Sequence, residues 1–216
     1  MSLPEKSPLI TPELEQQLGL VFEKLTTDVP LFCIAGDDEH SSEMVLFLKH
    51  LVSLSPRLTV RFLAPGEDTA LDEALDAALL PATGVGGPVP RMVFHGVPGG
   101  REITPFAAAI LSAGGGAKEL PWHRSREISK LTSPLKLQVF VSLSCQHCAQ
   151  LVTHAQHIAW ENPNVTAHMI DARLYPGLVE QHKLERVPIT VVNGRGQIPG
   201  GKTLLELCAI LRKRFL

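Results

Sequence analysis

The sequence predicts an α/β protein that contains the same architecture twice, with mixed strands flanked by helices in each half. Segments with the alternating pattern of a strand and segments with the 3.6-residue pattern of a helix follow one another along the 216 residues. Their order in residues 11–113 returns in residues 136–215. Apolar residues form 44% of the chain, which suffices for two cores of about 100 residues each.

The first half begins with a helix that starts at Pro12. Thr11 is a good N-cap residue, and proline is favoured at the first helical position. Strand and helix patterns then alternate. The strand patterns lie in 30–36 and 58–64, the helix patterns lie in 41–54, 71–80 and 105–113, and the segments 89–96 and 99–104 read as a hairpin.

The second half repeats this order. A strand at residues 136–142 is followed by a helix that carries Leu151, Val152 and Ile158 on one face. Each half therefore reads β-α-β-α-β-β-α. The later strands of the second half are expected in 165–172, 187–194 and 197–199, and its later helices in 177–184 and 202–215.

Two sequence correspondences support a duplication. Val-Pro-x-x-Val-x-x-Gly occurs at residues 89–96 and again at 187–194, and SPRLTVRF in the first half resembles NPNVTAHM in the second. The alternative is chance similarity between two α/β units. The glycine-rich stretch SAGGGAKELPW is the natural boundary, and a linking helix is expected after it. We therefore expect two domains, residues 1–118 and residues 119–216.

Cys145 and Cys148 form a C-x-x-C pair between a predicted strand and a predicted helix. If the helix begins near Cys145, free N–H groups and the helix dipole stabilise the thiolate of that residue. Cys145 is then the expected nucleophile, and Cys148 the thiol that resolves the mixed disulfide. Gln146 and His147 lie between them, where they are expected to contact a partner, and His147 favours the thiolate.

Other interpretations of the cysteines and of one glycine-rich motif are open. A zinc site could use the pair together with His154 and His157, although the H-x-x-H spacing is short, and two inert core thiols are a further alternative. Cys33 and Cys208 lie in apolar segments and are expected in the core. GQIPGGKT matches a phosphate-binding loop literally, but Asn-Gly before it predicts a hairpin turn followed by a strand.

The element order, with C-x-x-C at the first strand–helix junction, resembles the thioredoxin fold. Overlaying the two halves places Asp38 and Ser41 where Cys145 and Cys148 stand, so the first unit is expected to be redox-inactive. Two tandem units of this kind resemble the N-terminal domain of alkyl hydroperoxide reductase flavoprotein subunits, called AhpF. The segments that carry this resemblance are VFVSLSCQHC, ENPNVTAHMIDA, VPITVVNG and GREITPFAAAILSAGG.

This resemblance implies roles for further residues. Glu102 holds the place of a glutamate that approaches the disulfide and acts in proton transfer, against the alternative of a solvated Glu on a hairpin. Family members carry a cis-proline before the third strand, so Pro188 and Pro90 are the expected cis sites. Val187 and Pro188 should shape the groove that receives a partner.

The expected function is dithiol–disulfide exchange with protein thiols and disulfides. In that family the domain takes electrons from a following flavin and pyridine-nucleotide module and passes them to a peroxiredoxin, which the resemblance implies as the acceptor. This sequence has no G-x-G-x-x-G strand–helix fingerprint, so a separate flavin-dependent reductase is expected as donor. The Cys145–Cys148 disulfide is the expected redox centre, with no other cofactor and no metal. A histidine before the second cysteine is also the arrangement of DsbA-type oxidants, so the direction of electron flow stays open. The alternative is a non-catalytic adaptor with a regulatory dithiol.

Charge and N-terminal composition bear on partners and location. The formal net charge is -2, and no basic stripe indicates nucleic acid or a membrane surface. Early Glu and Pro residues and the lack of a continuous apolar run do not fit a secretory signal. A cytoplasmic protein is therefore expected.

Overall fold

The computed structural model describes residues 6–118 and 120–216. Residues 1–5, which belong to the segment predicted not to be a secretory signal, and residue 119, where the second domain is predicted to begin, lie outside the described residues. The elements in chain order are α1 (Pro12–Phe22), β1 (Val29–Ile34), α2 (Glu39–Val52), β2 (Leu58–Leu63), α3 (Thr69–Leu75), β3 (Ala82–Val85), β4 (Met92–His95), the 3-10 helix η1 (Gly100–Glu102), α4 (Ile103–Ala113), α5 (Trp122–Ser129), β5 (Leu135–Val141), α6 (Cys148–Glu161), β6 (Val165–Asp171), α7 (Pro176–Gln181), β7 (Ile189–Val192), β8 (Gly196–Pro199) and α8 (Leu204–Phe215).

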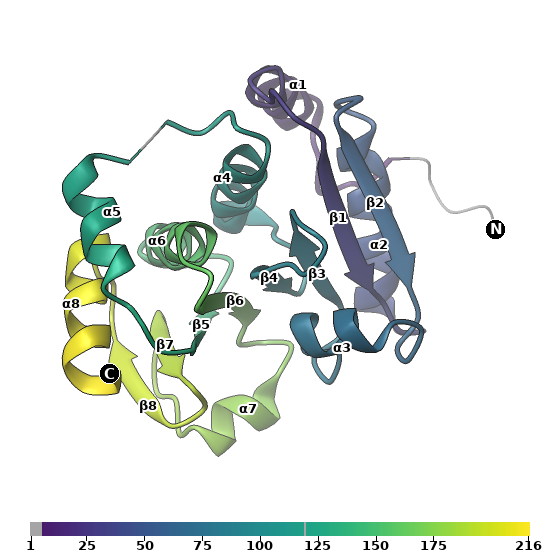
Figure 1. Cartoon of the computed structure of the whole chain (residues 1–216). Helices are drawn as coiled ribbons and strands as arrows, with labels where there is room; N and C mark the ends of the chain where they lie inside the picture. The colour runs from purple at the N-terminus through teal and green to yellow at the C-terminus, as the bar shows by residue number, and fades with distance from the viewer. Residues whose placement is uncertain (1–5, 119) are drawn as a thin grey trace.

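The strands of the described residues form one mixed sheet with the order β2-β1-β3-β4-β6-β5-β7-β8 (Figure 1). In the first half, β1 pairs with β2 in parallel and with β3 antiparallel, and β3 pairs antiparallel with β4. The second half has the same arrangement for β5, β6, β7 and β8. The two halves join where β4 pairs in parallel with β6. The expected fold of two tandem units with flanking helices is confirmed.

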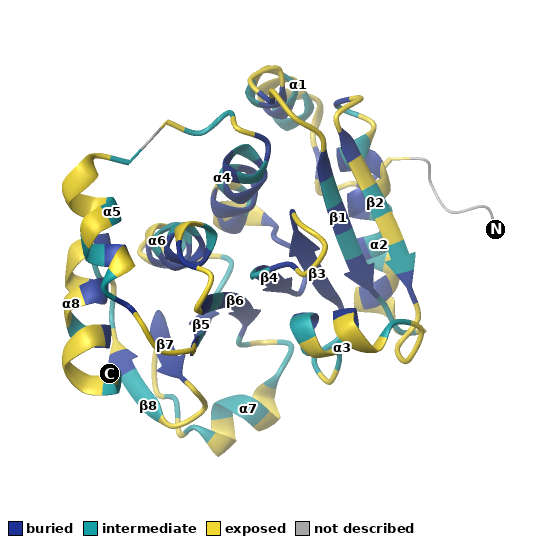
Figure 2. Cartoon of the chain, viewed as in Figure 1, coloured by how far each residue is buried: buried dark blue, intermediate teal, exposed yellow. Residues whose placement is uncertain are grey.

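Apolar residues cover both faces of this sheet. Along β5, Leu137, Val139 and Val141 face the large core beneath α4 and α6, whereas Phe140 faces a smaller cluster on the α7 side, because neighbouring strand residues point to opposite faces. Helices α4 and α6 pack side by side across the line where the halves meet (Figure 1). The central strands are buried, and the outer faces of the helices are exposed (Figure 2).

Several helix boundaries confirm the sequence signals. Thr11 caps α1 by accepting a hydrogen bond from the N–H of Leu14, and Pro12 is its first residue. Thr203 caps α8 in a capping box with Glu206. The linking helix α5 follows the glycine-rich boundary, and GQIP forms the edge strand β8 against β7. Within the described residues no helix is long and apolar enough to cross a membrane.

The predicted hairpin of residues 89–96 and 99–104 is wrong. The hairpin is formed by β3 and β4, and residues 99–104 make a tight turn of 3-10 helix that leads into α4. Strand β3 was hidden because Ala82–Val85 contains Ala and Gly, which have low strand propensity. Helix α3 ends at Leu75, earlier than predicted, because Asp76 adopts a left-handed conformation.

The expected cis-proline is right in the second half and wrong in the first. Val187–Pro188 is cis, but the other cis bond in the described residues is Leu80–Pro81, while Pro90 lies in the turn between β3 and β4. Pro81 directly precedes β3, as Pro188 directly precedes β7, so these two prolines are the equivalent pair. The repeated Val-Pro motif therefore precedes β4 in the first half and β7 in the second. These strands are not equivalent, so the motif does not align the duplicated units.

Two buried histidines connect the halves at the β4–β6 line. His95 Nε2 lies 3.0 Å from His168 Nδ1, and His95 Nδ1 lies 2.8 Å from the carbonyl oxygen of Leu79. A carbonyl only accepts, so His95 carries its proton on Nδ1, and Nε2 accepts from His168. Burial lowers the pKa of His95 to about 4 and holds the pKa of His168 well below its usual value. Both rings are therefore neutral in the folded protein.

This pair predicts a loss of stability in mild acid. A histidine whose pKa is lowered on folding contributes its full stability above its unfolded pKa near 6.5. That stability is lost progressively as the pH falls from about 6.5 to the folded value. We expect the free energy of unfolding of the wild type, relative to His168→Gln, to fall by on the order of 1–2 kcal/mol from pH 7 to pH 5. Urea titrations measure it.

His40→Gln is the matched control, because His40 is exposed. Its stability difference from the wild type should stay constant over the same pH range. An equally constant difference for His168→Gln would show that the buried pair is not the acid-sensitive element.

Candidate active site

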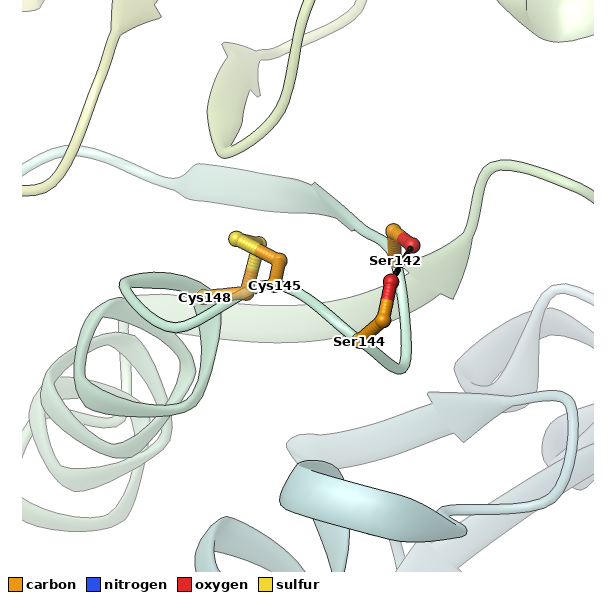
Figure 3. Close-up of a disulfide and its surroundings, with 4 residues drawn as sticks. All are labelled: Ser142, Ser144, Cys145 and Cys148. Atoms are coloured by element: carbon orange, nitrogen blue, oxygen red, sulfur yellow. Dashed lines mark hydrogen bonds between the residues drawn. A yellow bond between two sulfur atoms is a disulfide. The ribbon is translucent and has the colours of Figure 1, made fainter.

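Cys145 and Cys148 form a disulfide at the carboxyl end of β5 and the start of α6 (Figure 3). Their Cα atoms lie 5.5 Å apart, within the usual range for a disulfide. Cys148 is the first residue of α6. Cys145 lies three residues before it, in a turn in which the N–H of Cys145 donates to the carbonyl oxygen of Ser142. The helix thus begins later than the sequence interpretation assumed.

The two sulfur-bearing residues differ in exposure. Cys148 is completely buried in the main core, and Cys145 is half-buried at its edge. The hydroxyls of Ser142 and Ser144 on the preceding loop bond to each other at 3.2 Å (Figure 3). A partner from solvent can therefore reach Cys145 and not Cys148.

The N-terminus of α6 is free of a side-chain cap. His147 occupies the N-cap position, and its side chain makes no capping hydrogen bond. The first N–H groups of a helix have no partner inside the helix, and they carry the positive end of its dipole. This arrangement stabilises an anion beside the start of the helix, which is where the Cys145 thiolate forms when the disulfide is reduced.

The residues predicted to contact a partner lie between the two cysteines and just before the neighbouring strand β7. Gln146 and His147 are exposed. The loop before α8 comes close to His147, because a Cβ atom placed on Gly201 would lie 3.9 Å from the His147 Cβ. Val187, half-buried beside cis-Pro188, packs on the same core cluster as Cys145. Ile189 pairs with Phe140 in the β5–β7 ladder, so Val187 and Pro188, which precede it, lie beside the carboxyl end of β5 that leads into the cysteine loop.

Glu102 is a buried carboxyl group in the first half. It ends η1, has no exposed surface, and neither of its carboxylate oxygens has a hydrogen-bond partner among the described residues. The alternative of a solvated hairpin glutamate is therefore wrong. Burial, and second the nearby charge of Asp171, raise the pKa of Glu102 to about 7.

The segment that carries Glu102 lies against the cysteine loop. The N–H of Arg101 donates to the carbonyl of Leu143 at 3.4 Å, and a Cβ on Gly100 would lie 2.9 Å from the same carbonyl. Gly100 has φ 56°, which favours glycine, so the close approach requires this residue. Helix η1 also packs against α6. The first half thus supplies one wall of the site that holds the disulfide.

The corresponding place in the first half holds a closed polar pair. Asp38 is the N-cap of α2, and its carboxylate accepts from the Ser41 N–H at 3.0 Å and from the Ser41 hydroxyl at 2.6 Å. These bonds, above all the one from the hydroxyl, lower the pKa of Asp38. A fixed carboxylate therefore occupies the helix start where the second half carries a cysteine. A second difference concerns Leu80, the residue before the cis-proline of the first half, whose carbonyl oxygen accepts a hydrogen bond from the Tyr175 hydroxyl at 2.9 Å.

The other cysteines and histidines do not assemble into a site. Cys33 and Cys208 are buried, and burial raises the pKa of Cys33 to about 11 and that of Cys208 to about 12. Of the residues in the zinc alternative, His154 has its Nδ1 atom 2.9 Å from the carbonyl oxygen of Lys202, so the protein backbone already engages that nitrogen. In the part of the chain that the structure describes, no three His, Cys, Asp or Glu side chains are arranged to hold a metal ion.

Sequence reasoning missed Asp171, Tyr175 and Pro81. A signal existed for Pro81, because Pro-x-Thr-x-Val occurs at residues 81–85 and at 188–192. Asp171 and Tyr175 belong to no local motif. They act on the first half, through the charge near Glu102 and the hydrogen bond to Leu80, because the β4–β6 pairing brings the end of β6 beside that half.

The fold and the cysteine pair define a double thioredoxin-like protein with one dithiol–disulfide site. A family model described as Thioredoxin domain matches residues 135–211. The N-terminal domain of alkyl hydroperoxide reductase AhpF from Enterococcus faecalis is 30% identical in sequence, with a TM-score of 0.88 over 93% of this chain and 99% of that domain. The chain belongs to the family of AhpF N-terminal domains.

More distant relatives agree with this assignment. The F subunit of alkyl hydroperoxide reductase of Staphylococcus aureus is 26% identical over 94% of this chain and 38% of its own length. A protein of Bacillus subtilis named NADH dehydrogenase is 26% identical over 91% of this chain and 36% of its own length. The chain thus spans little more than a third of these curated relatives. A protein disulfide oxidoreductase from Aeropyrum pernix shares the fold, with a TM-score of 0.82 at 16% identity.

Glu102 predicts a second pH effect on stability. A carboxyl whose pKa is raised on folding stabilises the fold below its unfolded pKa near 4.5, and that stability is lost as the pH rises through about 7. We expect Glu102→Gln to gain on the order of 2 kcal/mol relative to the wild type between pH 5 and pH 8, measured by urea unfolding. Glu185→Gln, at an exposed position, should show a constant difference, and a constant difference for Glu102→Gln would contradict the raised pKa.

Proposed function

We propose that this chain is a thiol–disulfide oxidoreductase that exchanges its Cys145–Cys148 disulfide with protein partners. The observation that carries the proposal is the contrast between a half-buried Cys145 and a fully buried Cys148, joined by a disulfide at an uncapped helix start beside cis-Pro188. Disulfide exchange needs one accessible nucleophile and one protected resolving thiol. This contrast supports Cys145 as the nucleophile and Cys148 as the resolving thiol.

In the first step, the Cys145 thiolate attacks one sulfur of the partner disulfide. A Cys145–partner disulfide forms, the partner disulfide breaks, and the other partner sulfur leaves as a thiolate. The open start of α6 favours the Cys145 thiolate before the attack. Val187 and Pro188 support the partner chain beside the sulfur, and Gln146 and His147 contact it from the helix start.

In the second step, the buried Cys148 thiol must lose its proton. Glu102 accepts that proton as a carboxylate, and the Cys148 thiolate then attacks the Cys145 sulfur of the mixed disulfide. The intramolecular disulfide forms again, and the second partner sulfur leaves as a thiolate, so the partner gains two electrons and this protein loses two. The Glu102 pKa of about 7 suits this exchange because the group is partly protonated at neutral pH.

The family suggests the partners of this cycle. Relatives named as the F subunit of alkyl hydroperoxide reductase support a peroxiredoxin as the acceptor, because a peroxiredoxin disulfide is the oxidised product of hydroperoxide reduction. A flavin-dependent reductase that oxidises a nicotinamide cofactor is the proposed donor, in keeping with the relative named NADH dehydrogenase. Electrons then run from the donor through Cys145 and Cys148 to the acceptor. A cytoplasmic location fits these partners.

The roles of the two cysteines predict a trapped intermediate. In Cys148→Ser, Cys145 should still attack a peroxiredoxin disulfide, but the mixed disulfide should persist because no resolving thiol is present. Non-reducing electrophoresis and mass spectrometry of the linked peptides detect it. The variant Cys145→Ser should form no such complex. If neither variant is trapped and the Cys145 thiol titrates near 8.5, the chain is an adaptor without exchange activity.

The role of Glu102 predicts a defect in the second step alone. When reduced protein reacts with 5,5′-dithiobis(2-nitrobenzoate), the first thionitrobenzoate reports the attack of Cys145 on the reagent disulfide. The second reports the attack of Cys148 on the Cys145 sulfur of the mixed disulfide. Glu102→Gln should slow the second release by roughly 10²-fold at pH 7 and abolish its rise with an apparent pKa near 7. The first release should keep its rate, and an unchanged second release would remove Glu102 from the mechanism.

A further inference from the structure

Charge is divided unequally between the two halves of the chain. Residues 1–118 contain eight Lys and Arg residues against fifteen Asp and Glu, whereas residues 119–216 contain twelve Lys and Arg against seven Asp and Glu. The half that carries the disulfide is therefore basic, although the formal net charge of the whole chain is -2. A charge distribution of this kind favours encounters in which the second half meets an acidic surface.

Exposed basic residues of the second half gather on helices α5 and α8. Arg124 and Arg126 are exposed on α5, and the last turn of α8 carries Arg212, Lys213 and Arg214, which are exposed as well. The two helices pack against each other on the flank of the second half that lies away from the first half (Figure 1). The sequence shows no basic stripe because these residues come from two segments that are far apart in the chain.

The carboxylate between these two helices is already paired within the protein. Glu127 of α5 forms an ion pair with Lys130 and a second one, at 3.0 Å, with Arg212 of α8. Within the described residues, Arg124 and Arg126 form no ion pair. Their charges are therefore available to carboxylates of another molecule.

Large apolar side chains are exposed in the same region. Six such side chains are exposed in the described residues, and three of them, Trp122, Leu205 and Leu216, belong to α5, to α8 and to the residue that follows α8. Trp122 is the most exposed, at 73%, and Arg126 follows it four residues later on the same side of α5. Leu205 precedes Arg212 by seven residues, nearly two helical turns, so both lie on one side of α8. The outer surfaces of both helices are largely exposed (Figure 2).

We propose that the α5–α8 face is a docking surface for an acidic surface of a partner protein. The residues that form this face are Trp122, Arg124, Arg126, Leu205, Arg212 and Lys213. Tryptophan and arginine are the side chains that most often carry the binding energy of protein interfaces. Trp122 is the apolar anchor, and the basic residues around it pair with carboxylates of the partner.

The α5–α8 face is separate from the disulfide. The loop before α8 comes close to His147, and the basic residues at the other end of α8 lie about two turns farther along the helix. A partner held by these residues therefore leaves Cys145 open to a disulfide. The docking surface does not depend on the proposed exchange reaction.

Two other occupants fit the α5–α8 face less well. A helix that binds a membrane surface inserts its apolar side, but the apolar side of α8, which carries Leu204, Leu207 and Leu211, is buried in the core of this protein. A nucleic-acid backbone follows a groove of positive charge, whereas the carboxylate of Glu127 lies between α5 and α8. An acidic protein surface offers separate carboxylates and an apolar contact for Trp122.

Tryptophan fluorescence locates binding at this face. The chain has two tryptophans, and Trp160→Phe leaves Trp122 as the single fluorescent indole. The probe is a copolymer of glutamate and tyrosine, which is an acidic polypeptide with aromatic side chains. We expect the copolymer to shift the emission of Trp122 to the blue and to protect it from quenching by acrylamide, because binding buries the exposed indole. An unchanged emission and unchanged quenching at saturating copolymer overturn the inference.

Charge reversal separates this face from general attraction between charges. In calorimetric titrations with the same copolymer, Arg126→Glu should weaken binding by about tenfold, because a carboxylate then opposes the carboxylates of the probe. Trp122→Ala should weaken binding by a similar factor, since the anchor is gone. Lys24→Glu reverses an exposed charge of the first half and should leave the affinity unchanged. Equal losses for Arg126→Glu and Lys24→Glu, or no loss for Trp122→Ala, overturn the inference.

Further measurements distinguish the occupants of the face. A single-stranded oligonucleotide of thymidines and vesicles of phosphatidylglycerol and phosphatidylcholine are titrated at the same ionic strength as the copolymer. Weaker binding of both than of the copolymer supports the inference, and tighter binding of either overturns it. Sedimentation velocity tests a second copy of the chain, whose acidic first half carries the complementary charge. A dimer that Arg126→Glu dissociates would make that copy the occupant and overturn the inference, whereas a monomer supports it.

Discussion

The parallel pairing of β4 with β6 is the interaction on which the rest of this structure depends. Each half of the sheet has the same strand order, and this one pairing joins them into a continuous sheet. It brings η1, which follows β4, against the loop that follows β5, and so places Glu102 in the wall of a site whose cysteines belong to the other half. The hydrogen-bonded pair of neutral histidines, His95 and His168, lies on the same line.

The two halves use one architecture for different purposes. In the second half the start of α6 is uncapped and Cys145 stands beside it, so an anion that forms there is reactive. In the first half Asp38 supplies a permanent anion that is satisfied by Ser41, and the residue before the cis-proline is tied to Tyr175 of the second half. The first half therefore has no cysteine pair at this place, and it supplies the segment that lies against the cysteine loop and the buried carboxyl group of Glu102.

Much of the fold and the central chemistry could be predicted from local patterns. The caps at Thr11 and Thr203, the linking helix and the strand–C-x-x-C–helix context are all encoded within a few residues of one another. Errors arose where local signals were weak or misleading. Strand β3 contains Ala and Gly, and the repeated Val-Pro motif directed attention to Pro90 although the cis bond precedes Ala82.

The sequence by itself determined the order of elements, the duplication and the identity of the reactive pair, because helix and strand periodicity and cysteine spacing are short-range properties. Only the tertiary structure decided that Glu102 is buried rather than solvated, and that Cys148 is buried while Cys145 is half-buried. Those properties depend on which strands pair across long separations in the chain. Burial and the nearness of charges, not residue type, set the pKa values on which the chemistry depends.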